Sequence, residues 1–377
     1  MPKTFLLFDM DGVLLEPGGY QKALVSSIER IGKMLGVPST TITSDQIAQF
    51  EVLSITNEWD TLAICTAVTL LHVWQFDETI RLSGHFSIAS PVTNDLPDFD
   101  LFLASTNLVG DIPGETIFHS LVRNYPLINR DQRDHLADIL LNCRDIYRST
   151  TLPLHQETVL GSTTFEAHYK IKAQLNCESF LTKYDRPILT NKQILELNRW
   201  LQHPDHHAGI LTNRPCQTPP GFLSSPEAEL GIELLGLTQI PYVGSGILAW
   251  YAMKQKEAQE FLFLKPNPVH TLALLQRCLG RSISDSLNIA ASLWQGHTDQ
   301  VNWQSLEKAK IYIFEDSVKG LMSGKSACQL IANLGIETSL TLVGISHNHI
   351  KLDALTEIST YNIDNLNTLD WVDLTKQ

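Results

Sequence analysis

The feature that most constrains the fold is a short apolar run near the N-terminus that ends in two acids. Residues 5–8 are all apolar and predict a buried strand. Asp9 and Asp11 follow the run directly, and Gly12 comes next. Positions i and i+2 of a strand point to the same side. As the strand gives way to a loop, both acids can therefore face one crevice at its carboxyl end, where open α/β sheets bind ligands.

Two neighbouring carboxylates repel each other unless a cation or a shared proton lies between them. Asp9 and Asp11 therefore indicate a site for a hard divalent cation, with Mg²⁺ as the best match, and one carboxylate left to act as a nucleophile. Gly12 permits a tight turn that lets a phosphate group approach. The alternative is a solvated acidic turn, which is the usual explanation of an isolated D-x-D pattern. Segments farther along the chain favour the site.

Composition limits the classes of partner. The chain has 377 residues, 43% of them hydrophobic, and a net charge of −13, which predicts two domains with a real core. No run of lysine or arginine is present, so we expect neither nucleic acid nor a membrane as a partner. The six cysteines are scattered, and no signal peptide or long apolar stretch is visible. These features predict reduced thiols in a cytoplasmic protein. We expect a monomer or a homodimer.

Strand-like and helix-like segments alternate in the C-terminal half of the chain. The expected strands are 208–211, 240–243, 310–314 and 340–345, and the expected helices are 227–235, 267–279, 321–334 and 352–358. Such alternation predicts an α/β fold with a doubly wound, parallel, Rossmann-like sheet. The N-terminal strand would belong to the same sheet, although its companions lie beyond residue 205.

The block between these strands is mostly helical and reads as an insertion. Apolar spacing predicts helices over 21–35, from residue 44, and over 59–74, 114–123, 130–147 and 193–201. Residues 83–114 are rich in Pro, Asp, Ser and Gly and predict a long loop, and 282–306 reads as a second, smaller insertion. We therefore expect a discontinuous α/β core formed by 1–16 and 192–377, with a helical domain over 17–191.

Three further segments place polar residues where a predicted strand ends or a helix begins. Thr212 and Asn213 follow an apolar strand, although Thr190 ends an almost identical run. We assign Thr190 as the N-cap of the next helix, because an amide follows in its first turn. Lys265 precedes a proline-initiated helix, where an ordinary surface lysine is the alternative. An apolar strand over 310–314 ends in two adjacent acids, Glu315 and Asp316.

The order and spacing of these four segments resemble the haloacid dehalogenase (HAD) superfamily, over about 2–15 and 200–377. The resemblance implies that Asp9 attacks phosphorus and that Asp11 protonates the leaving oxygen and then activates water, roles that suit two neighbouring carboxyl groups. The dehalogenases that give the superfamily its name lack this second acid. Asp11 therefore favours a phosphatase acting on a small phosphorylated metabolite.

The remaining roles are also implied by the resemblance. Thr212, Asn213 and Gly12 would hold phosphate oxygens, and Lys265 would neutralise the phosphoryl group and the nucleophile. Asp9, Asp11, Asp316 and Glu315 would hold Mg²⁺, with Asp11 contributing its backbone carbonyl and Glu315 acting directly or through water. Arg214 could reach the phosphate, but an exposed residue at the start of a helix fits the sequence equally well.

In this superfamily an insertion after the first strand forms a helical type-1 cap that closes over the site and selects the leaving group. Here the insertion is unusually long. Asn57, Trp59 and Asp60 open one of its helices, as caps or core residues. Arg144 and Arg148 could contact the remote part of a phosphate ester, although surface placement is as compatible with their spacing. Two alternatives to the phosphatase are a phosphomutase of the same superfamily and a non-catalytic HAD-like binding or regulatory protein.

Other patterns are weaker. Residues 320–326 resemble a P-loop, but three residues rather than four separate Gly320 from Gly324, so we expect Lys325 to be an exposed helix residue. The histidines around position 206 lie in a predicted helix-to-strand loop without a matching ligand cluster. The segment 244–246 predicts only a turn, because it lacks the third glycine and the acid of a dinucleotide-binding fingerprint.

Overall fold

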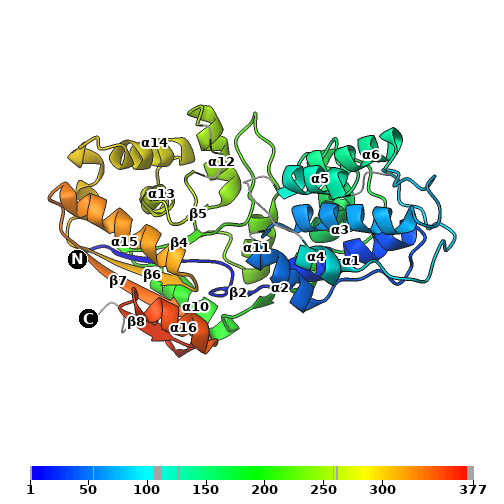
Figure 1. Cartoon of the computed structure of the whole chain (residues 1–377). Helices are drawn as coiled ribbons and strands as arrows, with labels where there is room; N and C mark the ends of the chain where they lie inside the picture. Colours follow the sequence, from blue (N-terminus) through cyan, green and yellow to red (C-terminus); the bar gives the residue numbers. More distant parts are fainter. Residues whose placement is uncertain are drawn as a thin grey trace. The chain divides into compact units, whose positions relative to one another are not determined.

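The chain divides into two compact units in the computed structural model (Figure 1), which describes residues 2–53, 55–105, 113–124, 128–257, 259 and 262–371. Unit 1 comprises Met1–Pro17 and Asp185–Gln377, and unit 2 comprises Gly18–Tyr184. Residues 185–191, which were predicted to belong to the inserted domain, lie in unit 1. The reason is a short antiparallel pairing of β2 (Leu15–Glu16) with β3 (Arg186–Pro187), which joins the two segments of unit 1.

Unit 1 is built around a six-stranded sheet with the order β5-β4-β1-β6-β7-β8, in which every pair of neighbours is parallel. Its strands are β1 (Thr4–Phe8), β4 (His206–Leu211), β5 (Tyr242–Val243), β6 (Ala309–Glu315), β7 (Thr338–Ile345) and β8 (Tyr361–Ile363). The chain leaves β1 toward β4 and β5 and later returns to β6 on the other side of β1. The predicted α/β class and parallel sheet are therefore confirmed, and the direction of winding reverses beside β1.

Helices cover both faces of this sheet, which explains the continuous apolar runs of its strands. They are α10 (Asn191–Trp200), α11 (Glu227–Leu235), α12 (Ser245–Lys254), α13 (Pro268–Cys278), α14 (Ile283–Trp294), α15 (Val318–Asn333) and α16 (His349–Thr356). Helices α13 to α15 lie on one side of the sheet, and α10 and α16 lie on the other (Figure 1). All five residues of β1 are buried. The N-terminal strand is thus the centre of the unit.

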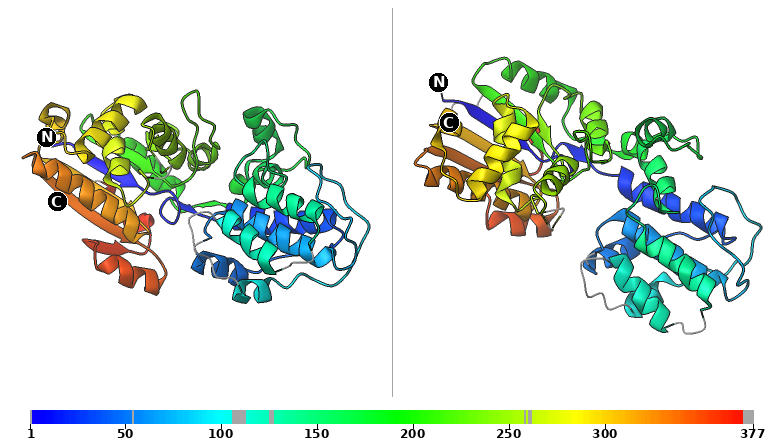
Figure 2. Two further views of the ribbon diagram at one scale, coloured as in Figure 1. Left: turned by 45° about the horizontal axis from the view of Figure 1, so that its top comes forward. Right: turned by 90° about the horizontal axis from the view of Figure 1, so that it is seen from above.

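Unit 2 is helical in the part of it that the structure describes (Figure 2). Its helices are α1 (Gly19–Met34), α2 (Ser44–Val52), α3 (Glu58–Val73), α4 (Phe99–Ser105), α5 (Pro113–Asn124), α6 (Arg130–Leu141), α7 (Leu152–Leu160), α8 (Ser162–Tyr169) and α9 (Phe180–Tyr184). Helix α3 is buried on nearly all sides and contacts α1, α4, α5 and α6. Unit 2 therefore has a hydrophobic core of its own, separate from that of unit 1.

Several predicted elements differ from the observed ones. The long loop over 83–114 is wrong in part, because Phe99 and Leu103 are buried in the unit 2 core and α4 forms there; residues 106–112 lie outside the described part. The helix over 130–147 ends at Leu141, since Asp145 N–H bonds the Asn142 carbonyl in a turn. Helices α7 to α9 and strand β8 were not predicted.

Two further corrections concern unit 1. The segment 244–246 is not only a turn, because Ser245 begins α12. Gly246 is needed there for close packing, since a Cβ would collide with Ser224 and with the Cys216 carbonyl. The predicted insertion over 282–306 contains α14, which packs against α13. Among the described residues, no helix combines the length and apolarity needed to cross a bilayer.

Candidate active site

The predicted site residues are brought together by the register of the sheet. Phe8 of β1 lies opposite both Ile210 of β4 and Phe314 of β6. The backbone N–H of Asp9 donates to the Phe314 carbonyl at 2.9 Å. The first residue after β1 is therefore a direct neighbour of Glu315, although the two are far apart in sequence. The carboxyl ends of three adjacent strands meet at this point.

Lys265 is a buried cation between two acids. Its Nζ lies 2.7 Å from Asp9 Oδ1 and 2.6 Å from Glu315 Oε1, and it donates to the Leu211 carbonyl at 3.0 Å. The segment before α13 carries it there, and Asn267 caps that helix by accepting from Val269 N–H. Lys265 thus contacts the residues at the ends of β1, β4 and β6, so the structure brings the four predicted segments together.

The acids Asp9, Glu315 and Asp316 form one cluster whose carboxylate oxygens lie within 4.8 Å of one another. Gly12 has a φ of +77°, and a Cβ on it would lie 2.5 Å from Asp316 Oδ2. A Cβ on Gly320 would overlap the Glu315 carboxyl group. Both glycines are therefore required by the close approach of these acids. Clustered carboxylate oxygens are the donor set that a hard divalent cation prefers.

The electrostatics of the cluster follow from burial and from the excess of acids. Burial raises the pKa of Asp9, and the nearby Glu315 and Asp316 carboxylates raise it further, while Lys265 lowers it. Burial likewise raises the pKa of Glu315. Burial lowers the pKa of Lys265, but the Asp9 and Glu315 carboxylates raise it by more, so the ammonium stays charged. The buried Lys265 contacts two of the three carboxylates, and the largely exposed Lys351 contacts the third, so the acids outnumber the cations by one.

Asp11 has a partner that was not predicted. Its carboxylate accepts from Arg214 Nε at 2.9 and 3.1 Å and from Arg214 Nη2. Arg214 Nη2 also lies 2.8 Å from Asp185 Oδ2. The side chain of Arg214 is 1% exposed. The expectation of an exposed Arg214 is wrong, because the side chain is buried and its guanidinium contacts two carboxylates. Its reach to a phosphate stays a prediction.

Thr212 and Asn213 follow β4, as predicted. Thr212 is fully buried, and its Oγ1 accepts from Arg214 N–H at 3.0 Å. A hydroxyl that accepts one bond still has a proton to donate. Asn213 is exposed. The predicted phosphate contact of these residues stays a prediction, whereas the assignment of Thr190 as N-cap of α10 is confirmed by its bond from Gln193 N–H at 3.3 Å.

Two residues near the acidic cluster were not predicted from the sequence. Lys351 on α16 places its Nζ 2.8 Å from Asp316 Oδ2, with its side chain 57% exposed. His270 on α13 bonds the Val243 carbonyl at 2.9 Å and is fully buried. Burial and the charge of Lys265 lower the pKa of His270 to about 3, so the imidazole is neutral. Neither position carries a motif, and no pattern in the sequence marks them.

The weaker patterns find structural roles. Gly320 N–H donates to the N-cap Ser317, and Gly324 packs against Ile313, so both glycines serve the packing of α15 rather than a P-loop. Lys325 is exposed, as expected. His206 and its neighbour were expected in a loop, but they begin β4, where His206 stacks on Trp200. These rings are packing residues of the sheet.

In unit 2, Asp60 is buried and pairs with Arg144, whose Nη2 lies 2.7 Å from Asp60 Oδ2. The two residues therefore hold α3 and the segment after α6 together. Asn57 occupies the N-cap position of α3 without a side-chain cap bond. Arg148 is exposed. The ion pair gives Arg144 a structural role that its position in the sequence did not indicate.

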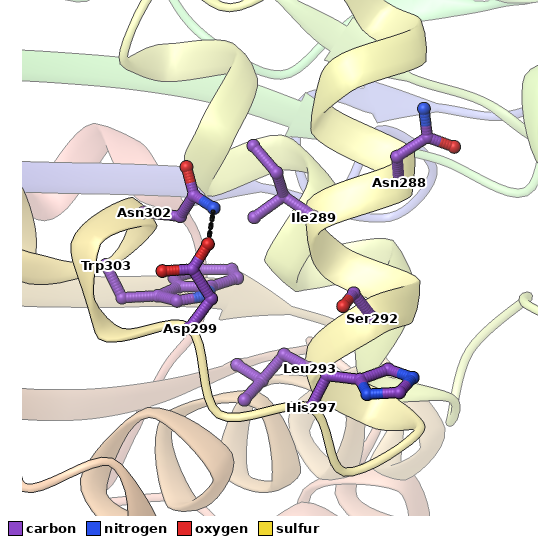
Figure 3. A pocket seen from close by; sticks show the side chains of 8 residues that line it. All are labelled: Asn288, Ile289, Ser292, Leu293, His297, Asp299, Asn302 and Trp303. Carbon is purple, nitrogen blue, oxygen red and sulfur yellow. Dashed lines mark hydrogen bonds between the residues drawn. The ribbon is translucent and has the colours of Figure 1, made fainter.

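A pocket of 190 Å³ lies elsewhere in unit 1, between α14 and the turn that follows it (Figure 3). It is lined by Asn288, Ile289, Ser292, Leu293, His297, Asp299, Asn302 and Trp303. In the close-up, Asn302 and Asp299 point toward each other and share a hydrogen bond. None of the lining residues belongs to the acidic cluster, so the pocket is not part of the candidate site.

No protein-family model matches the chain, and no curated protein matches it. Among solved structures, the crystal structure of a target of the Northeast Structural Genomics Consortium is similar, with a TM-score of 0.62. The two chains are 18% identical over 97% of each. At this identity the similarity shows a shared fold alone.

Proposed function

We propose that this chain is a Mg²⁺-dependent phosphoric monoester hydrolase of the HAD superfamily, acting on a small phosphorylated metabolite through an aspartyl-phosphate at Asp9. The observation that carries the proposal is the contact of Lys265 with Asp9 and Glu315 at the carboxyl ends of β1 and β6. The second acid, Asp11, lies two residues beyond the proposed nucleophile. Unit 2 would act as the cap that selects the leaving group.

The donor set fits a magnesium ion. Asp9, Glu315 and Asp316 would hold it, with the backbone carbonyl of Asp11 as a further oxygen ligand. When bound, the ion would neutralise phosphoryl oxygens and help to align the phosphate with the nucleophile. Lys351 is largely exposed and can leave Asp316 when a cation binds.

The chain's own residues would supply the nucleophile and carry out the proton transfers of both steps. A carboxylate oxygen of Asp9 forms a bond to phosphorus as the ester oxygen leaves with its electron pair and takes a proton from Asp11. Asp11, now ionised, removes a proton from water, whose oxygen attacks phosphorus and releases Asp9. The products are an alcohol and inorganic phosphate. Lys265 stabilises the negative charge that both steps bring to the site, and Thr212 and Asn213 would bind phosphoryl oxygens.

The test is a panel of phosphate esters assayed for phosphate release with Mg²⁺. We expect at least one ester to be hydrolysed, and EDTA to lower the rate by about 10²-fold or more, with recovery on adding Mg²⁺. Formation of an isomerised phosphosugar without free phosphate would instead identify a phosphomutase. No turnover of any ester would favour the non-catalytic binding protein.

A further inference from the structure

Arg214 joins two acids that are distant in sequence. Its guanidinium bonds the carboxylate of Asp11, in the loop after β1, and that of Asp185, which directly precedes β3. The side chains of Arg214 and Asp185 are 1% and 0% exposed, whereas that of Asp11 is 34% exposed. The proposed proton shuttle is thus the accessible end of a buried ion-pair chain.

The backbone and side chain of Arg214 are held from several sides. Its N–H donates to Thr212 Oγ1, and its carbonyl accepts from Ser245 N–H at the start of α12. Gly231 of α11 leaves space for the side chain, since a Cβ there would lie 3.4 Å from Arg214 Nη1 and 2.7 Å from Met10 Sδ. A guanidinium fixed in this way presents a rigid fork to its partner.

We propose that Arg214 is a positioning residue that fixes the Asp11 carboxylate for proton transfer, with Asp185 as its buried anchor; this inference rests on the proposed phosphatase activity. The two buried cations serve different acids, because Lys265 contacts Asp9 and Arg214 contacts Asp11. The nucleophile and the proton shuttle therefore each have a cation of their own, which keeps the two carboxylates in separate orientations.

The hydrogen bonds also distinguish the two oxygens of Asp11. Oδ1 accepts from both Nε and Nη2 of Arg214, whereas Oδ2 accepts from Nε alone. A carboxylate oxygen can accept two bonds. Oδ2 can therefore still accept a further hydrogen bond, whereas both acceptor positions of Oδ1 are used. The geometry assigns Oδ2 as the atom that carries the proton to the leaving oxygen and then takes one from water.

The test compares a poor and a good leaving group. Arg214→Lys keeps the positive charge but loses the paired N–H donors of the guanidinium, so the Asp11 carboxylate should remain present but be misoriented. We expect kcat/KM for ethyl phosphate, whose leaving oxygen needs a proton, to fall by about 10²-fold. The leaving group of 4-nitrophenyl phosphate departs without a proton, so kcat/KM for this ester should change by less than about 5-fold. Its kcat should still fall, because hydrolysis of the phospho-enzyme needs Asp11 as a base.

Asp11→Asn serves as the reference and should show the same dependence on the leaving group with a larger loss. If R214K does not fold, Asp185→Asn carries the same comparison, because it keeps Arg214 and removes only the charge of its anchor. Equal losses of kcat/KM on both esters in these variants would overturn the positioning role while leaving the phosphatase intact. Failure of the unmodified chain to hydrolyse these two esters and every other ester of the panel would reject the proposed function itself.

Discussion

Replacing Asp9 with asparagine should lower kcat for any ester that the chain hydrolyses by about 10⁴-fold or more. The amide cannot form the acyl phosphate, so the loss of the nucleophile removes the whole two-step route. The fold should persist, because Lys265 keeps its contact with Glu315 at 2.6 Å and the amide oxygen can still accept from Nζ. Circular dichroism and denaturant unfolding measured alongside the kinetics would show whether the lost activity comes from the chemistry alone.

The covalent intermediate offers a second readout of the same variant. Asp11→Asn keeps the nucleophile but lacks the base that activates water, so it should retain labelled phosphate after an acid quench with radiolabelled 4-nitrophenyl phosphate. Asp9→Asn should retain none. Measurable turnover or protein-bound label in D9N would contradict the assignment of Asp9, whatever the behaviour of the other variants.

The predicted site residues that the structure brings together share one property: each follows a strand of the parallel sheet or precedes one of its helices. Asp9 and Glu315 follow positions that the register sets opposite each other, so knowing the sheet was enough to place them together. Lys265 was assigned from the resemblance of its segment to a superfamily motif, since a lysine before a proline-initiated helix by itself indicates only a surface residue. Local patterns could therefore predict the α/β fold and the acidic cluster of the site.

The residues that were missed depend on tertiary contacts. Asp11 and Arg214 are 203 positions apart, and Arg214 reads locally as the start of a helix. Asp185 directly precedes β3, and a strand of two residues is too short to show the alternation of apolar and polar residues that predicts a strand. Similarly, α4 forms because Phe99 and Leu103 bury against the unit 2 core, which outweighs the polar composition around them. Burial decides these features, and burial is not visible in a single sequence.

Replacing Lys265 with methionine should lower the free energy of unfolding by about 3–5 kcal/mol at neutral pH, because it leaves two buried carboxylates without their cation. In the unmodified protein burial raises the pKa of Asp9 and of Glu315, and Lys265 lowers both. Removing the ammonium therefore raises both pKa values further in the folded state. An acid with a raised folded pKa destabilises the fold above its unfolded pKa, so the loss should shrink as the pH falls toward about 4.

Urea unfolding of K265M in EDTA, at about pH 7.5 and about pH 5, measures this effect without a divalent cation in place of the ammonium. Lys325→Met is the matched control, because Lys325 is exposed on α15 and its loss should change stability by less than about 0.5 kcal/mol. A loss in K265M that is the same at both pH values would mean that packing of the lysine stem, rather than its charge, stabilises the cluster. A loss confined to neutral pH, and reduced when Mg²⁺ replaces EDTA, would show that the three carboxylates need a cation to fold together.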